Sequence, residues 1–62
     1  MDNLAAYRRK SDAELQYIAR DAAEAAIAMH GWDGAAEAKY LDQVNDASTV
    51  LYERRQQQRT AQ

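Results

Sequence analysis

The pattern of apolar and polar positions divides the chain into two long helical segments. Apolar residues recur every three or four positions over 15–29 and again over 40–51, which is the period of an amphipathic helix. Between these segments lies Gly31-Trp32-Asp33-Gly34, which holds both glycines and the single tryptophan, and the sequence has no proline. We therefore predict an all-α fold, an antiparallel helical hairpin with helices over 12–30 and 34–57. A short N-terminal turn over 2–10 and a frayed tail over 58–62 complete one domain, 1–62.

Helix-end signals support these boundaries. Ser11 and Glu14 have the spacing of a capping box, in which each side chain bonds the other residue's backbone amide. Gly31 suits a left-handed C-terminal cap, and Asp33 suits the N-cap of the second helix. In this geometry Trp32 is expected to pack back on Ile27.

Helical spacing also predicts which side chains face inward. On the first helix these are Leu15, Ile18, Ala19, Ala22, Ala25, Ala26 and Met29, and on the second they are Tyr40, Leu41, Val44, Ala47, Ser48 and Leu51. Within the N-terminal turn, Leu4 and Tyr7 are expected to face inward. Small side chains in the middle of the first set favour close contact between the two helices.

Composition indicates that one hairpin alone would be only marginally stable. Of the hydrophobic 47% of the chain, 14 residues are alanine, and Leu, Ile, Val and Met together supply only ten. Alanine buries little area, whereas ordering each residue's backbone costs about 1–2 kcal/mol. Small domains usually need an additional stabilising device, and the chain has no cysteine for a disulfide. We therefore expect a homodimer, most simply a four-helix bundle.

Several apolar residues fall outside the predicted contact between the helices. Tyr17 and Ile27 lie on the back of the first helix, Val50 lies off the main stripe of the second, and Trp32 lies in the loop. Such residues can form a partner-binding surface, for a second hairpin or for a foreign protein. The alternative is that they are scattered surface hydrophobes, which are common, and that Trp32 only fastens the loop.

Basic residues are predicted to gather at the open end of the hairpin. Antiparallel pairing brings Arg8, Arg9 and Lys10 close to Arg54 and Arg55. This basic pole could bind phosphates or an acidic protein. Alternatively, these residues simply favour the C-terminus of a helix and keep the chain ends solvated. The net charge of −2 gives no general signal for nucleic acid.

The sequence offers little for catalysis. With no cysteine and one histidine, His30, a metal site made by the chain alone is not expected, and we expect no cofactor. Nothing matches a nucleophile–base–orienter set or a phosphate-binding glycine loop, so we do not expect an enzyme. The sequence has neither an apolar run that could span a membrane nor a secretory signal pattern, so a cytoplasmic location is expected.

Two segments carry a resemblance. Lys10-Ser11-Asp12-Ala13-Glu14-Leu15 and the stretch Lys39-Tyr40-Leu41-Asp42-Gln43-Val44-Asn45-Asp46-Ala47 resemble small uncharacterised helical proteins of temperate bacteriophages and other mobile elements. The resemblance implies a regulator that binds a protein of the bacterial host. In architecture alone, the hairpin is similar to a plasmid RNA-binding protein whose two hairpins form a four-helix bundle. We therefore expect a small non-enzymatic protein-binding regulator. The alternatives are a nucleic-acid-binding protein that uses the basic pole and a structural assembly subunit.

Overall fold

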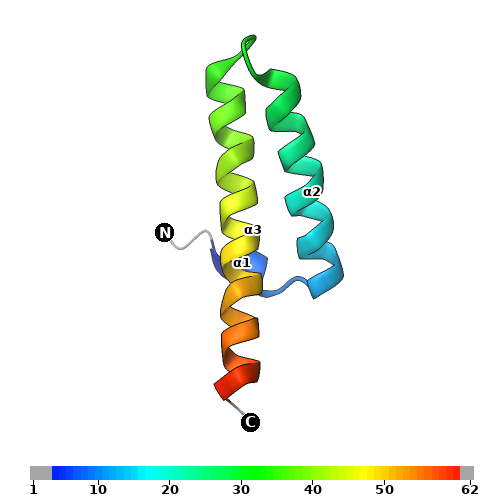
Figure 1. Ribbon diagram of the computed structural model, residues 1–62, viewed down its shortest axis with the longest axis vertical. Coiled ribbons are helices and arrows are strands. Elements are labelled where there is room, and N and C mark those ends of the chain that lie inside the picture. The colour runs from blue at the N-terminus through cyan, green and yellow to red at the C-terminus, as the bar shows by residue number, and fades with distance from the viewer. Residues whose placement is uncertain (1–3, 61–62) are drawn as a thin grey trace.

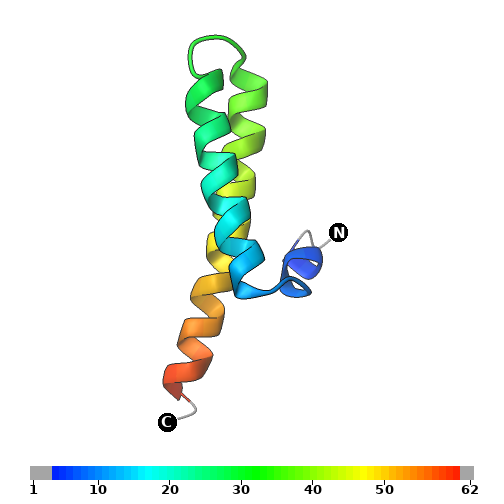
Figure 2. The same ribbon diagram turned by 90° about the vertical axis from the view of Figure 1, so that its right-hand side faces the viewer.

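A computed structural model describes residues 4–60, which form three helices (Figure 1). Helix α1 spans Leu4–Arg8, α2 spans Asp12–Met29 and α3 spans Gly34–Thr60. Helices α2 and α3 run antiparallel side by side, and α1 packs against α3 near the open end of this hairpin (Figures 1 and 2). The C-terminal turns of α3 project beyond the start of α2 (Figure 2). The prediction of an all-α fold is confirmed.

The observed helix ends differ from the predicted ones by a few residues. Helix α2 ends at Met29 and His30 forms its cap, one residue earlier than predicted. Helix α3 continues to Thr60, three residues beyond the predicted end at 57. The predicted N-terminal turn contains a true helix, α1. The parts of these predictions that concern 2–3 and 61–62 lie outside the described residues.

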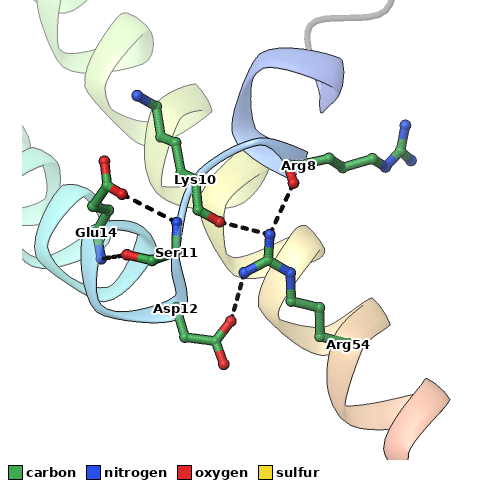
Figure 3. Close-up of polar contacts among 6 residues, drawn as sticks. All are labelled: Arg8, Lys10, Ser11, Asp12, Glu14 and Arg54. Carbon is green, nitrogen blue, oxygen red and sulfur yellow. Dashed lines mark hydrogen bonds and ion pairs between the residues drawn. The ribbon is translucent and has the colours of Figure 1, made fainter.

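The start of α2 is fixed by the predicted capping box. The amide of Glu14 donates to the Ser11 hydroxyl at 3.1 Å, and the amide of Ser11 donates to the Glu14 carboxylate at 3.2 Å (Figure 3). The hydrogen bond from the Ser11 backbone holds the pKa of Glu14 below its ordinary value of 4.5, and the bond with the Ser11 side chain adds to the effect. The ionised form of Glu14 therefore stabilises this helix end.

The connection between α2 and α3 also follows its sequence signals. Gly31 has a φ of +84°, a conformation that glycine adopts without a steric penalty. The amides of Trp32 and Asp33 then donate to the carbonyl of Met29 at 2.9 and 3.0 Å. The carboxylate of Asp33 accepts the amide of Ala36 at 3.0 Å, as expected of an N-cap. One tight turn thus ends α2 and starts α3.

The core is concentrated at the open half of the hairpin. Leu15, Ala47 and Val50 form its buried centre, and the partly buried side chains packed around them are Leu4, Tyr7, Ile18, Ala19 and Leu51. Towards the loop, Ala22 and Ala26 are buried, as predicted. Alanines bring the helices close together but remove little apolar area from water. The loop half of the hairpin therefore has a thinner core than the open half.

The predicted inward face of α3 is partly wrong. Leu41 and Ser48 are exposed, whereas Val50, expected off the main stripe, is 1% exposed and lies in the core. The reason is α1, which packs on α3 beside the hairpin and brings Leu4 and Tyr7 against the cluster that contains Val50. Helix α3 therefore buries a face directed towards both α1 and α2.

Arg54 joins α3 to the segment between α1 and α2. Its guanidinium donates to the carbonyl oxygens of Arg8 and Lys10 at 3.0 and 2.7 Å and to the carboxylate of Asp12 at 2.5 Å (Figure 3). A planar guanidinium can serve several acceptors at once. Beside it, Arg8 pairs with Glu53 at 3.2 Å. These contacts hold α1 in place across the open end.

Candidate functional site

An apolar surface groove lies between α2 and α3 near the loop. Its volume is about 390 Å³, and it is lined by Ala23, Ala26, Ile27, His30, Glu37, Leu41 and Val44. Ile27 is 75% exposed and Leu41 is 51% exposed. Two large aliphatic side chains, one from each helix, thus stand in water beside small alanines. We call this surface the loop-end groove.

Polar groups mark the two ends of the face that contains this groove. At the loop, His30 Nδ1 and the carboxylate of Glu37 are 2.8 Å apart. Towards the open end, a more polar hollow includes Gln16, Leu51 and Arg55. Helical geometry places Arg55 on the same side of α3 as Glu37, because 18 residues make five full turns. The face therefore has an apolar middle, an acidic group at one end and a basic group at the other.

Tyr17 belongs to a different surface. Its side chain is 68% exposed and lines a shallow hollow with Lys10, Ala13, Glu14 and Ile18. The ten residues between Tyr17 and Ile27 correspond to about 80° around the helix and about 15 Å along it. The prediction that both residues lie outside the contact between the helices is confirmed, but they line separate hollows.

Trp32 does not fasten the loop as expected. It is 86% exposed, and the high exposure of Ile27 shows that the two side chains do not bury one another. The tight turn at Gly31 places the indole on the outside of the hairpin. The packing prediction is therefore wrong, and Trp32 stays a candidate for a partner contact.

Val50 is not part of any exposed apolar surface. Its burial beside Leu15 and Ala47 makes it a core residue, so the prediction that it contacts a partner is wrong. Sequence reasoning instead missed Leu41, which was expected to face inward. The spacing of Ala47, Val50 and Arg54, at intervals of three and four, follows the observed stripe on α3 and leaves Leu41 off it.

The basic pole is less available than predicted. Arg54 makes the three contacts described above, and Arg8 is paired with Glu53. Arg9 and Arg55 are exposed, and Lys10 is partly buried. Antiparallel pairing therefore does bring basic residues to the open end, but Asp12 and Glu53 neutralise part of their charge.

Residues 4–60 contain neither a metal centre nor a membrane span. Within this range no group of three or more His, Cys, Asp or Glu side chains is arranged to hold a metal ion. No helix in the same range is long and apolar enough to cross a bilayer. Comparison with protein-family models, curated proteins and solved structures found no match to this chain.

Proposed function

We propose that this chain is a small non-enzymatic regulator that acts by binding another protein, as a homodimeric four-helix bundle in the cytoplasm of a bacterial host. The observation that carries the proposal is the exposed Tyr17 on the side of α2 away from the loop-end groove. An exposed tyrosine that lines an apolar hollow is typical of residues that dominate the energy of protein interfaces.

The surroundings of Tyr17 fit a transient protein contact. Lys10 and Glu14 border the hollow, while Ala13 and Ile18 add apolar surface. An aromatic centre with a charged rim is the usual arrangement in interfaces that form and dissociate. The expected target is a protein surface with an apolar pocket for one tyrosine ring and with groups of both charges around it.

The proposal favours a protein target over nucleic acid because of the state of the basic pole. Phosphate binding needs cations that are free to approach the backbone of the nucleic acid. Arg54 instead bonds Asp12 and two backbone carbonyls, and Arg8 bonds Glu53. The charge that would attract phosphate is thus partly used within the chain.

Site-specific photocrosslinking in bacterial cells tests this function. A photoreactive phenylalanine replaces Tyr17, and as a control it replaces Ala28, which is exposed on the same helix. We expect a discrete adduct with a different protein at position 17 and not at position 28. Adducts with nucleic acid, or the same adducts from both positions, would contradict the proposal.

Affinity measurements with the crosslinked protein provide the second step. Tyr17→Ala should weaken binding at least tenfold, which corresponds to about 1.4 kcal/mol, because a central aromatic contact is lost. The matched variant Glu24→Ala, also exposed on α2, should bind like the parent protein. Equal affinities of the two variants would show that Tyr17 is not the contact.

A further inference from the structure

We propose that the loop-end groove and the face around it are covered by the same face of a second copy of this chain, with the two hairpins antiparallel. This inference rests on the homodimer of the proposed function and adds the surface, the orientation and the register of the two copies. It assigns a role to Ile27 and Leu41, which neither fill the core nor surround Tyr17.

The exposed surface of the chain is larger than its mass requires. The chain exposes 4941 Å², whereas a compact monomer of its mass, 7.0 kDa, exposes about 4,000 Å². The excess of about 900 Å² is close to the roughly 800 Å² that each partner buries in a standard interface. One contact of ordinary size would therefore give the chain the exposed area expected for its mass.

The core of the hairpin is uneven along its length. At the open half, α1 covers the buried cluster with Leu4 and Tyr7. At the loop half, the buried residues are the small Ala22 and Ala26, while the larger Ile27 and Leu41 are exposed. The missing apolar layer lies on the side of the hairpin that holds the groove. A second hairpin placed there supplies that layer and makes a bundle of four long helices.

The charges at the two ends of the face select the orientation of the second copy. Glu37 and Arg55 lie on the same side of α3, near opposite ends of the face. Parallel hairpins would bring two Glu37 carboxylates together at one end and two Arg55 guanidiniums at the other. Antiparallel hairpins pair Glu37 of each copy with Arg55 of the partner subunit, which is complementary.

The two-fold axis then fixes which residues meet. Pairing position 37 with position 55 places Leu41 against Leu51 of the partner subunit, on either side of an axis near residue 46. The apolar centre would contain Leu41, Leu51, Val44 and Ile27 from both copies. Tyr52, which is 62% exposed, lies about 60° around α3 from the line through Glu37 and Arg55 and so borders the same region. Tyr17, about 80° further around α2 than Ile27, stays open to a target.

Sedimentation equilibrium tests the surface. The parent chain should sediment as a dimer, at twice 7.0 kDa, at tens of micromolar. Leu41→Gln combined with Ile27→Gln should weaken the dimer at least tenfold, because both substitutions place amides in its apolar centre. The matched variant Tyr17→Gln should stay dimeric. A monomeric parent chain would overturn the inference. So would a double variant that forms dimers with the same dissociation constant as the parent chain.

An experiment on the unmodified sequence tests the orientation without any risk of misfolding. A mixture of isotope-labelled and unlabelled chains is examined for intermolecular NOEs between methyl groups. We expect an NOE between Leu41 and Leu51 of different copies, which cannot arise within one helix because the residues are about 15 Å apart. NOEs between two copies of Leu41, or contacts through Tyr17, would overturn the antiparallel arrangement. Either result would leave the crosslinking test at Tyr17 unaffected.

Discussion

Individual residues decide where each helix of this chain begins and ends. Gly31 takes a left-handed conformation, Asp33 caps α3, and Ser11 caps α2 with Glu14. All three roles could be predicted from sequence, because caps and turns depend on the local chemistry of a few neighbouring residues. The exposure of Trp32 could not be predicted, because it depends on the direction in which the turn at Gly31 places the side chain.

The two glycines should respond oppositely to alanine. Gly31→Ala should lower the free energy of unfolding by about 1 kcal/mol, because an L-residue is strained at its φ of +84°. Gly34→Ala should raise that free energy by about 0.4–1 kcal/mol, because alanine gives the unfolded chain less conformational entropy to lose on folding. Gly34 lies in the helix, and an added Cβ there would meet only open space. Urea unfolding at one protein concentration measures both. The same sign for the two variants would contradict the assignment of the turn.

The capping box should make stability depend on pH. The pKa of Glu14 is lowered in the folded chain, so its contribution is fully present above its ordinary pKa of 4.5 and is lost as the pH falls through the lower folded value. Ser11→Ala should cost about 1 kcal/mol near neutral pH and less at acidic pH, where Glu14 is protonated. Urea unfolding of the parent chain and of Ser11→Ala from acidic to neutral pH measures this difference in the free energy of unfolding. A constant difference would show that Glu14 and Ser11 are not coupled.

At the scale of elements, α1 determines which face of α3 is buried. Sequence periodicity predicted a two-helix stripe through Leu41 and Ser48, whereas the observed core uses Val50. A five-residue helix carries too little pattern to reveal which neighbour it packs against. The inward positions on α2 were predicted more accurately, because that helix packs mainly against α3.

Arg54 should be the residue that holds α1 against α3. Arg54→Gln removes the hydrogen bonds to two backbone carbonyls and to Asp12, and we expect a loss of about 1–3 kcal/mol. Amide hydrogen exchange in residues 4–10 should accelerate. Arg55→Gln, one position further along and exposed, should change the free energy of unfolding by less than about 0.5 kcal/mol. This comparison is made at a protein concentration at which sedimentation finds the chain monomeric, so that the proposed dimer does not affect it.

Equal exchange rates in α1 for the Arg54 and Arg55 variants would contradict this role of Arg54. Helix α1 would then be held mainly by the packing of Leu4 and Tyr7, together with the pair between Arg8 and Glu53. In that case Leu4→Ala should accelerate exchange over the same residues, since its side chain packs against the core cluster.

At the scale of the whole molecule, the candidate binding surfaces lie where the short helix α1 does not cover the hairpin. It closes one side of the hairpin near the open end, and the opposite side near the loop keeps Ile27 and Leu41 exposed. The sequence predicted that the chain needs additional burial, because alanine content is visible in composition. It could not predict which face provides that burial, because Leu41 was assigned to the core.

The most direct test of this account is the thermal midpoint measured over a hundredfold range of protein concentration. If a second copy completes the hairpin, the free energy of unfolding depends on protein concentration. A concentration one hundred times the dissociation constant of the dimer adds about 2.7 kcal/mol to that free energy. A change of 1 kcal/mol moves the midpoint of a domain of this size by roughly 4–8 °C. We expect a rise of several degrees in the thermal midpoint of the parent chain and a much smaller rise when Ile27 and Leu41 are both replaced by glutamine. A midpoint that stays constant across the range would contradict it.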